Sequence, residues 1–275
     1  MFSSFELFGR TIGMYGIMSI AGLSIAVLFF YLQVKKKGVP FDDVIIMVLV
    51  AAAGILIGGH MLYGVTQIPN IVLVFQNLSK LSVGDAISYL ATCFGGSVFF
   101  GGLLGSIASG AIYLKHTRWE PEVKIALTDT YACAIPLFHT FGRIGCFLGG
   151  CCYGIESSFG FIAHGNTFVP ELNDVRRFPV ALCEAVCNLV LFLVLWRVLK
   201  REKKPGRLIY YYCVSYSVIR FSLEFLRGDE IRGRLWIFST SQWISAFLFM
   251  FCFIRLAMFH KLERKMDAGD VVSER

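Results

Sequence analysis

HTFGRIGCFLGGCCYG, residues 139–154, places one arginine, Arg143, inside an otherwise apolar run. A charged side chain within a bilayer costs about 2.5–3.5 kcal/mol on insertion scales, so it needs a compensating partner. We expect that partner to be an anion, because the glycines around Arg143 leave room for another group to approach the backbone closely. The alternative is that Arg143 lies near a helix end and extends its guanidinium to the membrane interface.

The composition is typical of a polytopic membrane protein. The mean hydropathy is +0.65, 56% of the residues are hydrophobic, and 16% are charged. Apolar runs long enough to span a bilayer predict seven transmembrane helices, near residues 11–33, 43–64, 88–114, 125–148, 179–199, 208–226 and 236–259. We therefore predict an all-α fold, with a single membrane domain over residues 1–260.

The distribution of basic residues predicts the orientation in the membrane. The loops on one side carry 16 Lys and Arg residues and those on the other side carry 7. The positive-inside rule then places the N-terminus outside and the C-terminus, with a short tail at 261–275, in the cytoplasm. The same rule accounts for the net charge of +7, so the charge does not indicate nucleic-acid binding. An external arm is predicted near residues 65–87, partly in the membrane interface.

A glycine-rich segment in the third predicted span permits close approach of another group. Gly101 and Gly102 belong to the run FFGGLLG at 99–105, and Gly101 and Gly105 have the G-x-x-x-G spacing. One interpretation is tight helix packing. The other is a floor over which a lipid headgroup or acyl chain lies, and the two are compatible.

Helical spacing gathers polar residues on two faces. His139, Arg143, Cys146 and Gly150 fall at i, i+4, i+7 and i+11. In the sixth span Arg220, Glu224 and Arg227 fall at i, i+4 and i+7, and Glu184 is an intramembrane carboxylate in the fifth.

An Arg220–Glu224 ion pair would neutralise itself, which leaves Arg143 and Arg227 without an assigned partner. A guanidinium binds phosphate oxygens in pairs, so we expect a lipid-headgroup pocket with arginine clamps. His139, Glu184 and Glu224 are candidate bases if chemistry occurs there.

Four segments resemble motifs of the prolipoprotein diacylglyceryl transferase family. Residues 142–154 are similar to its signature G-R-[IL]-G-N-F-[IL]-N-G-E-x-x-G, and residues 220–227 to R-F-x-x-E-F-x-R. Residues 178–185 resemble H-P-x-Q-L-Y-E-A, and residues 241–245 resemble the closing Q-x-[IL]-S segment. Tyr15-Gly16 and Gly58-Gly59 match early positions, so the resemblance runs in order from about residue 12 to residue 250.

The resemblance implies a bacterial enzyme of the cytoplasmic membrane, with seven spans and no cofactor or metal. It moves diacylglycerol from phosphatidylglycerol to the lipobox cysteine in the signal-peptide region of a prolipoprotein, which releases glycerol phosphate. Arg143 and Arg220 would hold the phosphate, and Arg227 would stand at the mouth of the site. The other expected substrate-binding residues are Glu224, Tyr15, Cys146, Gly101, Gly102 and Gly154.

The sequence also departs from the family pattern. Phe100 stands where the family has histidine, Cys146 replaces the signature asparagine, and Cys151 replaces the signature glutamate. Phe178 also replaces a family histidine, and His60 stands where arginine is usual. The phosphate clamp survives these changes, whereas the family's acid–base group does not.

Two explanations of these departures compete. In the first, His139 supplies the missing imidazole as a catalytic base. In the second, the chain is a divergent paralogue that transfers to another acceptor through Cys151, or a non-catalytic phospholipid-binding or transport protein.

The cysteines Cys146, Cys151 and Cys152 leave three alternatives open. They are small packing residues, they act as a reactive thiol or a disulfide, or, with His139, they hold a soft metal. The remaining cysteines, which lie mostly within spans, are expected to pack as small hydrophobic residues.

Overall fold

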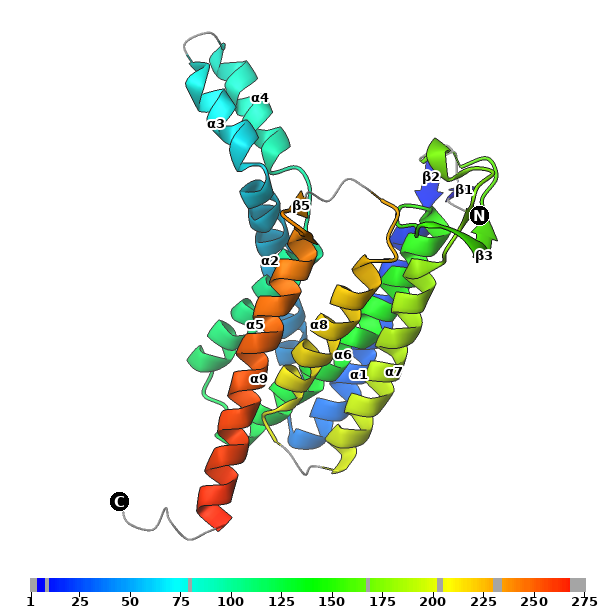
Figure 1. Cartoon of the computed structure of the whole chain (residues 1–275). Coiled ribbons are helices and arrows are strands. Elements are labelled where there is room, and N and C mark those ends of the chain that lie inside the picture. Colours follow the sequence, from blue (N-terminus) through cyan, green and yellow to red (C-terminus); the bar gives the residue numbers. More distant parts are fainter. Residues whose placement is uncertain are drawn as a thin grey trace. The chain divides into compact units, whose positions relative to one another are not determined.

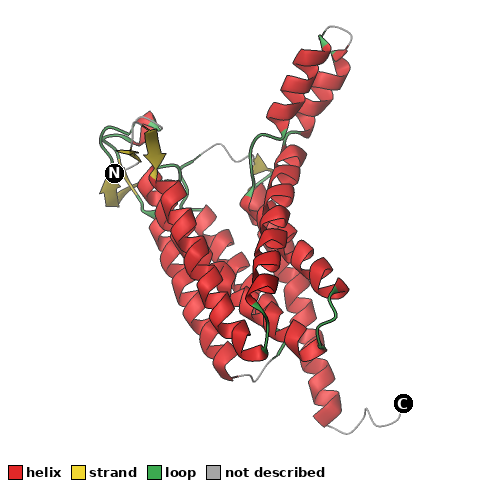
Figure 2. Cartoon of the chain, turned by 180° about the vertical axis from the view of Figure 1, so that it is seen from behind, coloured by secondary structure: helices red, strands yellow, loops and turns green. Residues whose placement is uncertain are grey.

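Helices form most of the chain, as Figures 1 and 2 show. The computed structural model describes residues 4–7, 10–78, 81–166, 169–201, 205–229 and 234–267. Two compact units are present. The larger contains Met1–Lys37 and Ile125–Arg275, and the smaller contains Gly38–Lys124.

The larger unit is a helical bundle with short strands at its loops. Its helices are α1 (Met14–Val34), the 3-10 turn η1 (Lys35–Lys37), α6 (Pro121–Gly149, from residue 125 on), α7 (Val180–Arg201), α8 (Leu208–Glu224) and α9 (Thr240–Asp267). Helix α8 packs against both α7 and α9. Gly22 lets α1 approach α6, because a Cβ at Gly22 would lie 2.6 Å from the Cβ of Phe141.

Among the described residues, three antiparallel two-stranded ribbons connect or precede these helices. They pair β1 (Ser4–Leu7) with β2 (Arg10–Gly13), β3 (Glu156–Ile162) with β4 (Arg176–Arg177), and β5 (Arg234–Leu235) with β6 (Phe238–Ser239). A 3-10 turn, η3 (Pro170–Leu172), lies between β3 and β4.

The smaller unit is held together by close packing of α2 (Phe41–Thr66) along α5 (Phe99–His116). A Cβ at Gly101 would lie 2.2 Å from the carbonyl oxygen of Gly58, and a Cβ at Gly105 would lie 2.1 Å from that of Gly54. Gly102 is less crowded, because a Cβ there would lie 3.3 Å from Cγ2 of Ile55. Small residues at a membrane helix interface allow such backbone contact, so the packing interpretation of Gly101 and Gly102 has direct support.

The predicted third span, 88–114, is wrong as a single helix. The chain instead forms α4 (Val83–Cys93) and α5, with a break at residues 94–98. The glycine pair Gly95-Gly96 weakens the helix there, and the ring of Tyr63 occupies the space at 2.5 Å from a Cβ on Gly96. The predicted arm at 65–87 corresponds to α3 (Ile68–Gln76) and the start of α4, while residues 79–80 lie outside the described part.

Five of the described helices are long and apolar enough to cross a membrane: α1, α2, α6, α7 and α9. Helix α5, with 18 residues, is less apolar than these, and α8, with 17 residues, is shorter. At 1.5 Å per residue they measure about 27 and 26 Å, slightly below the thickness of a bilayer core. The multi-pass character is thus confirmed, and the count of seven spans stays a prediction.

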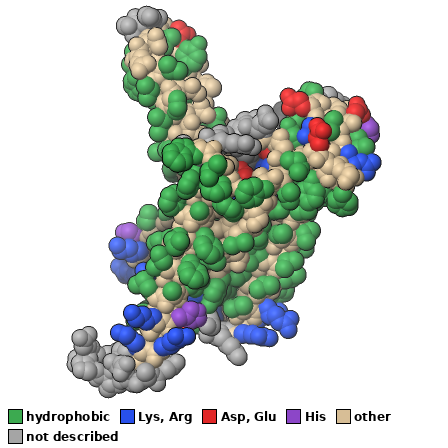
Figure 3. All heavy atoms as spheres, in the orientation of Figure 1, with side chains coloured by type: hydrophobic (Ala, Val, Ile, Leu, Met, Phe, Trp, Pro, Cys, Tyr) green, Lys and Arg blue, Asp and Glu red, His purple; other side chains and the backbone are tan. Residues whose placement is uncertain are grey.

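Basic side chains mark the same end of several helices in the larger unit. Lys35–Lys37 follow α1, Lys200 and Arg201 close α7, and Arg264 and Lys265 lie in the last turn of α9. Figure 3 shows blue basic side chains at the foot of α9 and hydrophobic side chains over the helices above it. Helix α9 continues to Asp267, and the rest of the predicted tail, 268–275, lies outside the described residues.

Gly101→Ala should destabilise the smaller unit by about 1–3 kcal/mol, because a Cβ 2.2 Å from a backbone oxygen forces α2 and α5 apart. Thermal unfolding of the purified protein in detergent measures the effect. Gly110→Ala is the matched control on the same helix, since nothing lies within 4 Å of its Cβ position. Equal melting temperatures for the two variants would contradict the glycine-packing account.

Candidate functional site

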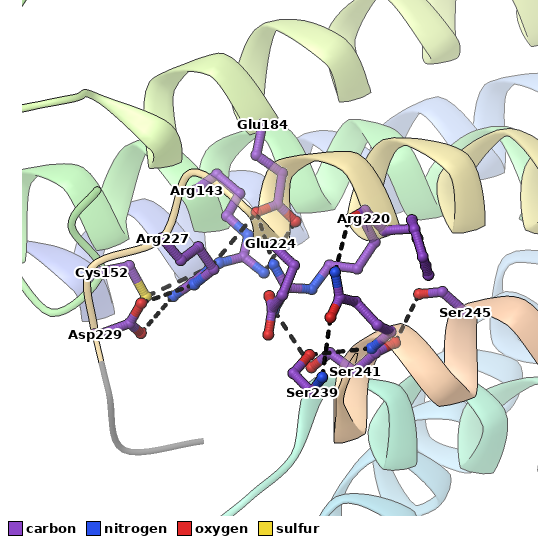
Figure 4. A network of polar contacts seen from close by, with 12 residues as sticks. Arg143, Cys152, Glu184, Arg220, Glu224, Arg227, Asp229, Ser239, Ser241 and Ser245 are labelled. Atoms are coloured by element: carbon purple, nitrogen blue, oxygen red, sulfur yellow. Dashed lines mark hydrogen bonds and ion pairs between the residues drawn. The ribbon is translucent and has the colours of Figure 1, made fainter. Parts of the chain in front are cut away.

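One buried carboxylate, Glu184 of α7, is the meeting point of three guanidinium groups (Figure 4). Arg143 of α6 places Nη2 3.1 Å from Glu184 Oε1. Arg220 of α8 and Arg227, just beyond α8, each place Nη1 3.9 Å from Glu184 Oε2. Glu184 is completely buried, and Arg143 and Arg220 are 6% and 2% exposed. Such a cluster in an apolar bundle is an electrostatically built site rather than a set of interfacial anchors.

Neutral polar groups complete the surroundings of Glu184. Tyr216 donates its hydroxyl hydrogen to Glu184 Oε1 at 3.2 Å, and Asn188 donates to the Glu184 carbonyl at 2.8 Å. His139 Nε2 accepts a hydrogen bond from Arg143 Nε at 3.1 Å, and the Tyr216 ring lies 5.1 Å from the imidazole. The lone pair of His139 Nε2 therefore orients the Arg143 guanidinium.

Two further carboxylates stand on the other side of the arginines. Glu224 Oε2 lies 2.6 Å from Arg220 Nη2. Asp229 accepts two hydrogen bonds from Arg227, at 2.8 Å from Nε and 2.6 Å from Nη2. The expectation that Arg143 and Arg227 lack protein partners is wrong, because their acids come from α7 and from the loop after α8. Formally, three positive charges face three negative ones.

Even so, two donors point inward without a hydrogen bond. Nη1 of Arg220 and Nη1 of Arg227 are buried, and no described residue accepts a hydrogen bond from either. Their distance of 3.9 Å from Glu184 Oε2 is too long for one. These nitrogens are the donors that remain available to an incoming anion.

The charge on Arg227 is well secured. Burial disfavours the charged form, but the hydrogen bonds from Arg227 to Asp229 outweigh it and raise the pKa of Arg227 above its ordinary value. Arg227 thus remains a cation at any physiological pH.

Gly154 serves the backbone that carries Arg227. It forms an antiparallel bridge with Arg227, and its amide donates to the carbonyl of Phe178 at 3.1 Å. A Cβ at Gly154 would lie 2.4 Å from that oxygen and 2.9 Å from the carbonyl oxygen of Leu226. In this structure Gly154 is surrounded by protein backbone, so it positions Arg227.

The signature cysteines gather at the end of α6. The sulfurs of Cys146, Cys151 and Cys152 lie within 4.8 Å of one another. Arg143 Nη1 is 3.9 Å from Cys152 Sγ, so this cluster borders the arginine site. Tyr15 of α1 packs against the same end of α6, because a Cβ at Gly145 would lie 3.2 Å from the Tyr15 Cα and one at Gly149 would lie 3.9 Å from the Tyr15 Cβ. The predicted face of His139, Arg143 and Cys146 is confirmed, whereas Gly150 lies just beyond the helix end.

The remaining expected residues lie elsewhere, and some partners were missed. Gly101 and Gly102 belong to the smaller unit. Sequence reasoning did not name Tyr216, Asn188 or Asp229, although Tyr216 precedes Arg220 by four residues and Asn188 follows Glu184 by four. That helical spacing is a signal for a shared face. Ser241, from the closing motif, lies 3.4 Å from Arg220 Nη2 and accepts its hydrogen bond.

Comparison with known proteins gives a consistent result. The family model described as prolipoprotein diacylglyceryl transferase matches residues 3–258. A phosphatidylglycerol–prolipoprotein diacylglyceryl transferase of Clostridium tetani is 34% identical over 246 residues, covering 88% of this chain and 91% of that protein. The enzyme of the same name numbered 2 in Clostridium perfringens is 29% identical, covering 96% and 97%. That of Geobacter sulfurreducens is 31% identical, covering 86% of each chain.

Glu184→Gln should destabilise the fold by about 3–5 kcal/mol, because it leaves buried guanidinium groups without their shared carboxylate. Thermal unfolding in detergent measures this change. Glu122→Gln, at an exposed position in the first turn of α6, is the control and should shift stability far less. A Glu184→Gln protein as stable as the control would show that the carboxylate does not hold the cluster together.

Proposed function

The chain belongs to the prolipoprotein diacylglyceryl transferase family, and from this premise we propose that it transfers diacylglycerol from phosphatidylglycerol to the lipobox cysteine of a prolipoprotein. The observation that carries the proposal is the convergence of Arg143, Arg220 and Arg227 inside an apolar bundle. A lipid phosphate is the anion most available at that depth, and guanidinium groups bind it in a bidentate manner.

In the proposed reaction the acceptor thiolate attacks the glyceryl carbon that bears the phosphate ester. A carbon–sulfur bond forms, the carbon–oxygen bond breaks, and glycerol phosphate leaves with the bonding electrons. Negative charge accumulates on the phosphate oxygens as the bond breaks. Fixed cations that face those oxygens lower the barrier without reorganising.

We assign the phosphate to Arg143 and Arg220, with Arg227 at the mouth of the site. The inward Nη1 donors of Arg220 and Arg227 support this assignment, since they have no hydrogen bond within the described residues. Glu224 holds Arg220 in place through the 2.6 Å contact. Tyr15 packs against the end of α6, the helix that carries Arg143 and Cys146, so both Tyr15 and Cys146 are proposed to border the bound headgroup.

We propose that the main role of His139 is to orient the guanidinium of Arg143. Its Nε2 accepts a hydrogen bond from Arg143, so taking a proton from an acceptor thiol at that nitrogen requires the hydrogen bond to break. Cys151 is the exposed thiol of the cluster, and it is the residue through which a paralogue would transfer to a different acceptor.

We further propose that the protein crosses a bacterial cytoplasmic membrane seven times as a single domain, with the N-terminus outside. The basic residues at the ends of α7 and α9 support a cytoplasmic location for those ends. Helices α5 and α8 would be the two additional spans.

The proposal is tested by incubating the purified protein with labelled phosphatidylglycerol and a lipobox peptide. Label joined to the peptide cysteine as a thioether supports the transferase. Label on the protein's own Cys151 supports a paralogue with another acceptor, and binding without turnover supports a lipid-binding or transport protein. Either of the last two results overturns the proposal.

Arg143→Ala should lower transfer at least about 100-fold, because a buried donor to the developing phosphate charge is lost. Phe100→Ala should retain activity, since the family histidine is already absent from that position. Initial rates of thioether formation, compared with an Arg201→Ala control at the exposed end of α7, measure both. If Phe100→Ala lost as much activity as Arg143→Ala, the result would contradict the assignment of the catalytic base to His139 of α6.

Arg220→Lys should also lose most activity, because an ammonium group cannot bind the phosphate with a planar fork. Lysine keeps the positive charge beside Glu184 and Glu224, so unfolding should change less than in Arg220→Ala. Activity and melting temperature are measured on the same preparations. Wild-type activity in Arg220→Lys would mean that Arg220 supplies charge alone.

A further inference from the structure

A sharp turn at the end of α6 brings the three signature cysteines together. Helix α6 ends at Gly149, and Gly150 follows in the left-handed conformation, with φ of +71°. A Cβ at Gly150 would also lie 2.2 Å from Asn166 Nδ2. Both the backbone conformation and the lack of space therefore require glycine at this position. The turn sends the chain back over the helix end, and the Cys151 thiol hydrogen-bonds to the Cys146 carbonyl at 3.7 Å.

The sulfur cluster is half closed. Cys152 is buried and Cys146 partly buried, whereas Cys151 is exposed. None of the nine cysteines, all of which lie in the described part of the chain, forms a disulfide bond. The cluster therefore has a closed side against the bundle and an accessible side.

Three convergent sulfurs match the needs of a soft cation. Thiolates select zinc and other soft ions over calcium or magnesium. A tetrahedral zinc with Zn–S bonds of about 2.3 Å separates its sulfurs by about 3.8 Å. The three sulfurs lie within 4.8 Å of one another, so they must close by no more than about 1 Å. Rotation of the exposed Cys151 side chain supplies such a movement. Three protein ligands with one position left open are typical of catalytic zinc sites.

We propose that Cys146, Cys151 and Cys152 bind one Zn²⁺ ion and that its open position takes the thiolate of the acceptor cysteine. This deepens the proposed function and rests on it, and it replaces the expectation that the chain uses no metal. The proposal gives the chain a means of activating the acceptor that needs neither the family's histidine at position 100 nor a proton transfer to His139.

The chemistry balances without a redox partner. The acceptor thiol loses its proton to solvent when its sulfur coordinates zinc, as metal-bound thiols do. The zinc-bound sulfur then supplies the electron pair for the new carbon–sulfur bond, and the carbon–oxygen bond to phosphate breaks. Glycerol phosphate leaves, and the thioether product, a weaker ligand than a thiolate, dissociates from the metal.

The neighbouring arginines suit this arrangement. Zinc with three thiolates carries a net charge of −1, and with the acceptor thiolate −2. Arg143 Nη1 lies 3.9 Å from Cys152 Sγ, and Figure 4 shows the Arg227 side chain beside Cys152. Arg143 would thus face both a metal ligand and the phosphate, which places the attacking sulfur and the leaving group next to each other.

Metal binding is measured first, on the full-length protein in detergent. The protein is stripped with a chelator, loaded with Zn²⁺ and desalted, and its metal content is determined by mass spectrometry. We expect about one zinc per chain, and almost none in Cys146→Ser, Cys151→Ser or Cys152→Ser. Cys183→Ser, a cysteine of α7 outside the cluster, is the control and should keep its zinc. No zinc in the wild-type protein, or a copper-selective site, overturns the proposal.

The open position is tested by replacing zinc with Co²⁺, whose absorption reports coordination. A lipobox peptide should change the cobalt spectrum, and the same peptide with serine in place of cysteine should not. The same spectrum for both peptides overturns acceptor activation. An intramolecular disulfide in the native protein, detected as a loss of two hydrogens by intact mass, also overturns it.

These outcomes separate the inference from the proposed function. If thioether transfer persists in the chelated protein and in Cys151→Ser, the proposed transferase function stands and the zinc proposal is wrong. If the protein binds zinc and the peptide thiol but transfers nothing from phosphatidylglycerol, the metal site stands and the proposed function is wrong.

Discussion

The larger unit depends on one carboxylate that is surrounded by guanidinium groups in an apolar interior. Burying any one of these charges alone would be too costly. An intramembrane arginine therefore needs a counter-ion. Glu184 supplies that counter-ion to residues from α6, α8 and the loop beyond α8. The positions of three separate segments are thereby tied to a single side chain.

The same cluster explains how a neutral set of charges can still recognise an anion. Glu224 and Asp229 each hold one face of an arginine at 2.6 Å, whereas the contacts to Glu184 Oε2 are 3.9 Å long. Glu224 and Asp229 orient the guanidinium groups of Arg220 and Arg227. The Nη1 atoms of both arginines have no hydrogen bond within the described residues. A bound phosphate would gain hydrogen bonds that the protein does not supply itself, so recognition depends on donor geometry more than on net charge.

Much of this was accessible from the sequence, for identifiable reasons. The spacing of His139, Arg143 and Cys146, and that of Arg220 and Glu224, follows from helical periodicity, and the structure confirms both faces. The counter-ion of Arg143 was not predictable, because periodicity relates residues on one helix and Glu184 lies on another. The pairing of Arg227 with Asp229, two residues further along, lies beyond the end of α8, where helical periodicity no longer applies. The break at residues 94–98 was missed because Gly95 and Gly96 continue an apolar run, and the packing of the Tyr63 ring against Gly96 is visible only in the structure. The clustering of Cys151 and Cys152 with Cys146 required the left-handed turn at Gly150, which no periodic pattern indicates.

The pairing of Arg143 with Glu184 has a consequence for biogenesis. The two residues lie on α6 and α7, which follow one another along the chain. During synthesis these helices can leave the translocon as one hairpin, in which each charge already neutralises the other. Arg220 and Arg227 emerge later, when Glu184 is already in the bilayer and can pair with them. The order of residues along the chain therefore sets the order of assembly.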